Sequence, residues 1–241
     1  MTTTSIIKEQ FKHIILNFKD YFLIALPLII GQTIVLQGDG IFNAYSDNFA
    51  FLAILILVVI LYAYYIFRFA VNLHRLVILQ EKNDYYSPLK HKKITLFYFL
   101  YLLLYFFVML LVIVLVQIID ELLNANYAIY TWLYLYIMII VSFLYSIYGF
   151  ILPEIAIGNK VSLKSSRQKS KGYRKILFYQ FLILYVPFWI FDRIVKKVVP
   201  ISDSFAFNLI YAIIFAFLTS LFIGSLSRTY LIAKENNSEL F

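Results

Sequence analysis

Close to its C-terminal end the chain reads SFAFNLIYAIIFAFLTSLFIGSLS, from Ser204 to Ser227, and this run of 24 residues carries no charge. An α-helix needs about 20 apolar residues to cross the roughly 30 Å of hydrocarbon in a bilayer. The run is too long for a barrel strand and lacks the strict alternation of one. Because unpaired backbone groups are costly in lipid, a helix is the structure that remains. The stretch therefore predicts a transmembrane helix.

Five more uncharged runs lie upstream of this one. The shorter runs can be extended by Lys and Arg side chains that reach back to the interface. With these extensions we expect six spans joined as three hairpins, so that residues 1–241 form a single all-α integral membrane domain. The expected spans are about residues 20–38, 48–75, 94–119, 125–152, 174–195 and 204–230.

The composition supports the membrane class and excludes several kinds of chemical site. Hydrophobic residues make up 63% of the chain and charged residues only 14%, which is typical of membrane proteins. The chain has no cysteine, so disulfides, thiol nucleophiles and zinc–thiolate sites are excluded. We find no nucleophile elbow, no His-Glu-x-x-His motif and no phosphate-binding glycine loop. We therefore expect no enzyme activity, no catalytic residue, no cofactor and no metal site.

The N-terminal segment predicts an amphipathic helix over residues 5–19. Its apolar residues recur at helical spacing between lysines, without the uninterrupted apolar core of a signal peptide. Thr4 or Ser5 is the expected N-cap. We expect this helix to lie in the membrane interface with its apolar face toward the lipid.

The basic residues predict the orientation. With both termini cytoplasmic, 17 of the 21 Lys and Arg residues lie in inner segments and three in outer ones. This asymmetry over short loops follows the positive-inside rule, and we expect a multi-pass inner-membrane protein with both termini cytoplasmic. The net charge of +8 is thus assigned to topology and to anionic membrane lipid, and we expect no nucleic-acid partner.

Arg68, Asn72 and Arg75 lie at positions i, i+4 and i+7, so they share one face near the end of the second expected span. They are either cations that reach the interface or a phosphate site for a lipid headgroup or an anionic solute. His74 points about 100° away and is expected to be an interfacial polar residue. With His13 and His91 both in cytoplasmic segments, a bis-histidine haem site is not expected.

The cytoplasmic loop 158–175 is the most basic segment of the chain. We expect a helix from Leu163 to Lys171, capped by Ser162 and ended by Gly172. Such a cluster attracts anionic lipid at about 1 kcal/mol per cation, or binds an acidic partner, or only sets the topology. Glu154 is expected to pair with this loop. The helix would align four cations in one stripe: Lys160, Lys164, Arg167 and Lys171.

Small residues recur every fourth position in the sixth expected span, at Ala212, Ala216, Ser220 and Gly224. Small residues at this spacing allow another helix backbone to approach closely. The stripe serves either packing within the fold or a homodimer face. In contrast, the third span has no small residue from Leu96 to Leu123, so we expect it to face lipid on much of its surface.

Two stretches carry a resemblance to a known family. Leu152–Gly158 reads LPEIAIG and is followed by Ser162-Leu163, and His74–Leu79 reads HRLVIL. These stretches and the hairpin plan resemble a broad group of bacterial six-span proteins, including the membrane-domain family associated with glycerophosphodiester phosphodiesterases. Many members carry Trp in the basic loop, where this chain has Ser165. The resemblance implies the six-span fold and carries over no catalytic residue.

The expected function is non-enzymatic. The chain is predicted to engage anionic lipid or a partner protein through its basic cytoplasmic face. The first alternative is a small-solute transporter or transporter subunit, which would need a polar cavity lined by Gln32, Gln37, Asn72 and Ser142. The second alternative is a lipid-modifying enzyme. The chain, however, lacks the acid–base pairs that such chemistry needs.

Overall fold

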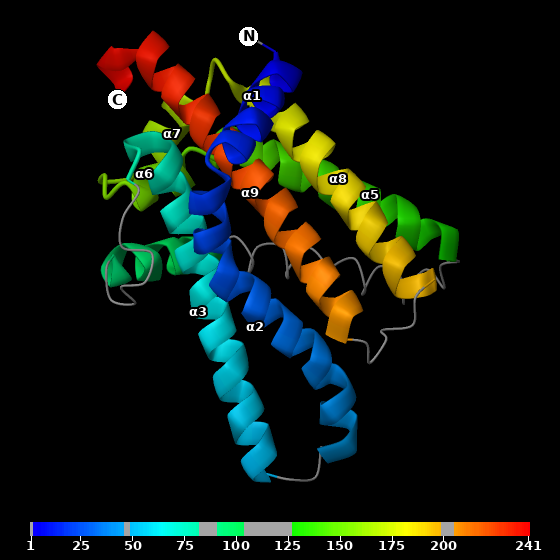
Figure 1. Ribbon diagram of the computed structural model, residues 1–241. Helices are drawn as coiled ribbons and strands as arrows, with labels where there is room; N and C mark the ends of the chain where they lie inside the picture. The colour runs from blue at the N-terminus through cyan, green and yellow to red at the C-terminus, as the bar shows by residue number, and fades with distance from the viewer. Residues whose placement is uncertain (1, 46–48, 82–90, 104–126, 199–204) are drawn as a thin grey trace.

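The computed structural model describes residues 2–45, 49–81, 91–103, 127–198 and 205–241, and within these ranges the chain is all-α, as the sequence predicts (Figure 1). Residues 92–103 form a further helix, which we call helix 92–103. Those elements are α1 (Thr3–Leu16), α2 (Phe18–Tyr45), α3 (Phe49–Leu79), α5 (Tyr127–Tyr148), α6 (Ile151–Ala156), α7 (Leu163–Lys169), α8 (Arg174–Val198), α9 (Phe205–Asn236) and a 3-10 turn, η1 (Ser238–Leu240).

Two of these helices contain a segment long and apolar enough to cross a membrane, Phe18–Gln37 in α2 and Phe205–Asn236 in α9. Of the expected span 94–119, only the part up to residue 103 lies within the described residues. In that part Thr95 and Tyr98 are buried, whereas Leu96, Phe97 and Leu100 are exposed.

Helix α9 forms the centre of the molecule. Figure 1 shows it between the α2–α3 pair and the α5–α8 pair, and it contacts α1, α2, α3 and α8. Ala212 and Ala216 belong to a core that includes Ile24 of α2 and Leu73 of α3. Ala212, Ala216, Ser220 and Gly224 are all buried. In the part of the chain that the structure describes, the small-residue stripe is therefore occupied by packing between its own helices.

Helix α1 begins earlier than the sequence suggested. Its N-cap is Thr2, whose hydroxyl accepts from the Ser5 backbone N at 3.3 Å, while the Ser5 hydroxyl accepts from the Thr2 N at 3.1 Å. The expected cap at Thr4 or Ser5 was thus wrong, because Ser5 is the reciprocal partner in a capping box. One face of α1, with Ile6, Gln10 and Ile14, is buried against α8 and α9.

Two further element boundaries differ from expectation. The first span was expected to end at residue 38, but α2 continues through Asp39 and Gly40 to Tyr45. A glycine inside a helix costs about 1 kcal/mol relative to alanine, which does not force the helix to end. The fourth span was expected to reach residue 152, but α5 ends at Tyr148 and the short helix α6 follows after Gly149.

The two ends of the described chain lie at one end of the molecule, together with α6 and α7 (Figure 1). This arrangement gathers the N-terminal helix, the basic loop and the end of α9 around a single face. We call this end of the molecule the basic end.

Candidate functional site

The four cations of the predicted stripe, Lys160, Lys164, Arg167 and Lys171, are all exposed at the basic end. Helix α7 begins after Ser162, whose hydroxyl accepts from the Ser165 N at 3.1 Å, so the predicted N-cap is confirmed. The helix ends at Lys169, two residues before the predicted end. The buried Ser170 hydroxyl donates to the Ile147 carbonyl at 2.7 Å, which holds the chain against α5. The predicted stop at Gly172 was therefore wrong.

Lys169 does not contribute its charge to this basic surface. Its ammonium pairs with Glu154 of α6, which is fully buried, and it lies 4.8 Å from the centre of the Phe241 ring. The expected pairing of Glu154 with the basic loop is confirmed. A buried carboxylate requires such a partner, because the charge would otherwise lose its hydration without compensation.

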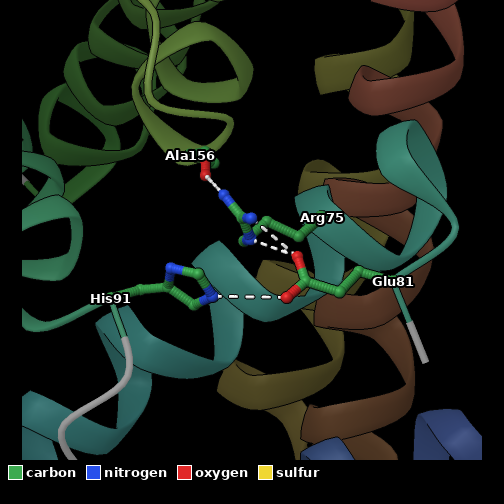
Figure 2. A network of polar contacts seen from close by, with 4 residues as sticks. All are labelled: Arg75, Glu81, His91 and Ala156. Atoms are coloured by element: carbon green, nitrogen blue, oxygen red, sulfur yellow. Dashed lines mark hydrogen bonds and ion pairs between the residues drawn. The ribbon is translucent and has the colours of Figure 1, made fainter. Parts of the chain in front are cut away.

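Arg75 is also engaged inside the protein (Figure 2). Its guanidinium donates from Nε to Glu81 Oε2 at 2.7 Å and from Nη1 to the Ala156 carbonyl at 3.0 Å. Nη2 lies 2.6 Å from the same Glu81 oxygen, and His91 Nε2 lies 3.4 Å from the other one. The turn that brings Glu81 back requires Gln80 in the left-handed region, at φ 52°. These contacts join the end of α3, the end of α6 and the start of helix 92–103.

The predicted arginine stripe therefore does not form one exposed phosphate site. Arg75 is held by a carboxylate and a carbonyl, Arg68 is only 5% exposed, and Asn72 is half-buried. The helical spacing along α3 indicated a shared face correctly. It could not indicate that α6 and the segment after α3 cover the C-terminal end of that face.

His74 is fully buried, which corrects its expected place at the interface. The Ser227 hydroxyl donates to the Ile223 carbonyl at 3.0 Å, so its oxygen accepts from His74 Nδ1 at 2.7 Å. His74 Nε2 then accepts from the Tyr98 hydroxyl at 3.0 Å. This relay joins α3, α9 and helix 92–103 and uses both ring nitrogens, so neither is available to a haem iron.

A second polar relay, not predicted from the sequence, holds α1 in place. Arg228 donates from Nε to Gln10 Oε1 at 2.8 Å, and the Gln10 amide donates to the Tyr21 hydroxyl at 2.7 Å. That hydroxyl lies 2.9 Å from His13 Nδ1. The available signal was Gln10 itself, which interrupts the buried row of Ile6 and Ile14 at helical spacing. A polar residue in such a row needs a buried partner.

Two cavities lie next to the basic end. The lysine cavity, of about 410 Å³, has lysines on two sides of an otherwise largely apolar wall. The apolar cavity, of about 300 Å³, is bordered by residues from six helices. Tyr101 lines both. The lining residues include Lys93, Phe97, Ile155, Gly158 and Lys160 for the lysine cavity and Leu102, Leu144, Leu163, Phe181 and Phe222 for the apolar cavity.

The polar residues expected to line a transport pathway border neither cavity. Gln32 accepts a hydrogen bond from Tyr62, and Ser142 is buried and donates to the Met138 carbonyl at 2.6 Å. Within the described residues, no group of three His, Cys, Asp or Glu side chains is arranged to hold a metal ion.

Comparisons with models of protein families, with curated proteins and with solved structures find no match to this chain. The resemblance to the six-span membrane domains therefore stays a prediction.

Proposed function

We propose that this chain is a non-enzymatic multi-pass membrane protein that binds anionic lipid headgroups through its basic end. The observation that carries the proposal is the exposure of Lys160, Lys164, Arg167 and Lys171. Neighbouring Arg75 and Lys169 are held by carboxylates, whereas these four cations project from one short segment. They are available to an anionic surface.

The outward apolar side chains of the helices support the membrane setting. Large exposed apolar patches on a protein mark contact with a membrane or a partner. Together with the two helices of sufficient length, they favour the six-span arrangement, with the basic end in the cytoplasm. Exposed examples include Ile30 and Ile34 of α2, Leu57 and Leu61 of α3, Ile139 and Phe143 of α5, and Ile210 and Ile213 of α9.

The charge of the stripe is sufficient for selectivity between lipids. Each cation near an anionic surface contributes about 1 kcal/mol, so four contribute on the order of 4 kcal/mol at low ionic strength. This attraction is screened over about 10 Å in 0.1 M salt. Binding should therefore favour phosphatidylglycerol over phosphatidylcholine and weaken as salt is added.

The test is native mass spectrometry of the protein in mild detergent, with phosphatidylglycerol or phosphatidylcholine added in equal amounts. A variant with Gln at all four stripe positions should lose most of the bound phosphatidylglycerol. The matched control replaces four other exposed cations, Lys8, Lys12, Lys19 and Lys234, by Gln and should keep the bound lipid. Equal retention of both lipids by the unmodified protein, or equal losses in the two variants, would overturn the proposal.

A further inference from the structure

We infer that the basic end contains a binding site for one phospholipid molecule, with its headgroup phosphate between Lys93 and Lys160 and an acyl chain in the apolar cavity behind them. This inference rests on the proposed function and deepens it. It turns attraction to a charged surface into a defined site between helix 92–103 and the segment that joins α6 to α7.

The lysine cavity has the chemistry of a headgroup site. Lys93, at the start of helix 92–103, and Lys160, in the segment before α7, both line it and are both exposed. The rest of its lining is largely apolar, with Phe97 and Ile155, and includes Asn159 beside Lys160. Two ammonium groups above apolar walls complement a phosphate attached to a hydrocarbon chain, and they match free phosphate less well.

The apolar cavity adjoins the lysine cavity at Tyr101, which lines both. It is bordered by Leu163 of α7 and by Phe181 of α8. Phe181 lies seven residues after the start of α8 at Arg174, which corresponds to a depth of roughly 10 Å at 1.5 Å per residue. The cavity thus extends from the basic end into the region between the helices, as an acyl chain would.

The Arg75 network positions the two walls of the lysine cavity. His91 contacts Glu81 two residues before Lys93, and the Ala156 carbonyl accepts from Arg75 two residues before Gly158 (Figure 2). Gly158 has φ 85°, a backbone conformation that L side chains rarely adopt, and it also lines the cavity. Arg75 is therefore a positioning residue for this site, although its guanidinium is not free to bind the phosphate.

A tryptophan reporter in the apolar cavity tests the site directly. Leu163 lines the cavity and is 52% exposed, so Leu163→Trp is compatible with the fold. The native Trp132 and Trp189 are replaced by Phe so that the new indole is the only one. Phosphatidylglycerol with brominated acyl chains should quench this fluorescence in a saturable way, since bromine quenches tryptophan only at short range. Tyr101→Trp, at the junction of the cavities, provides a second reporter.

The charge variants connect quenching to the two lysines. Lys93→Gln with Lys160→Gln should raise the apparent Kd for the brominated lipid about 30-fold, the factor expected from two cations worth about 1 kcal/mol each. Lys92→Gln with Lys234→Gln removes two other exposed cations and should change the Kd by less than about twofold, because neither residue lines the cavity.

The outcomes separate this inference from the proposed function. Retained phosphatidylglycerol that leaves both reporters unquenched would overturn the site and leave the surface function standing. The site would likewise be overturned if inorganic phosphate displaced the lipid completely at millimolar concentration, or if the two charge pairs behaved alike. Loss of all anionic lipid from the unmodified protein would overturn both the site and the surface function.

Discussion

Gly224 illustrates how one residue of α9 determines the docking of α1. A Cβ atom at this position would overlap the amide of Gln10, and that amide bonds both Tyr21 and Arg228. Gly224→Ala should therefore displace the Gln10 side chain and lose two hydrogen bonds of about 1 kcal/mol each. Alanine is the better helix former by about 1 kcal/mol, so the net loss of stability should be about 1 kcal/mol, measured by chemical unfolding in detergent.

The sign of this effect should reverse once Gln10 is removed. In a Gln10→Ala background the clash is absent, and Gly224→Ala should stabilise the protein by up to about 1 kcal/mol through helix propensity. Gly172→Ala is the control, because no atom lies within 4 Å of a Cβ there. If Gly224→Ala has the same effect in both backgrounds, then Gln10 does not occupy the space beside it.

His74 provides a second prediction for a single side chain. His74→Leu removes the acceptor of the buried Tyr98 hydroxyl, whereas Ser227 keeps its bond to the Ile223 carbonyl. One buried unsatisfied hydroxyl costs about 1–3 kcal/mol. Adding Tyr98→Phe should recover much of this loss, since the orphaned hydroxyl is then gone. A double variant as unstable as the sum of the single ones would contradict the relay, as determined by unfolding titrations.

At the scale of elements, the Glu154–Lys169 pair fastens α7 to α6. Lys169→Gln leaves the buried Glu154 carboxylate without its cation, and breaking a buried pair costs about 3–5 kcal/mol. Lys164→Gln on the same helix removes an exposed charge and should leave the midpoint of thermal unfolding unchanged. Glu154→Gln together with Lys169→Gln should be less harmful than Lys169→Gln alone. Equal midpoints for the two lysine variants would refute this role.

At this scale the helical class and the N-cap of α7 were predictable, whereas the N-cap of α1, the end of α7 and the contacts between helices were not. Ser162 as the cap of α7 follows from local chemistry, and the buried small residues of α9 follow from their spacing. The Arg75–Glu81 contact instead depends on the left-handed backbone at Gln80, which no propensity favours for that residue. Sequence spacing placed Arg75 correctly on a shared face of α3. It could not indicate that the Glu81 carboxylate binds the Arg75 guanidinium.

For the whole molecule, the absence of cysteine makes the topology directly testable. Lys164→Cys at the basic end should resist a membrane-impermeant maleimide in intact cells and react after lysis. Asp47→Cys and Ser202→Cys, in the loops expected outside, should react in intact cells. This pattern follows from the distribution of basic residues. Labelling of Lys164→Cys in intact cells would show that the orientation is opposite to the proposed one.

The contact between Gln10 and Arg228 has a consequence for folding during synthesis. The two residues are 218 positions apart. At a synthesis rate of about 5–20 residues per second, α1 leaves the ribosome roughly 10–40 s before α9 exists to receive it. Throughout that interval Gln10 can bond Tyr21 of α2, but it lacks Arg228, and the face of α1 that carries Gln10 is not yet covered by α9. Completion of the last helix, rather than insertion of the first, is the event that finishes folding at the N-terminus.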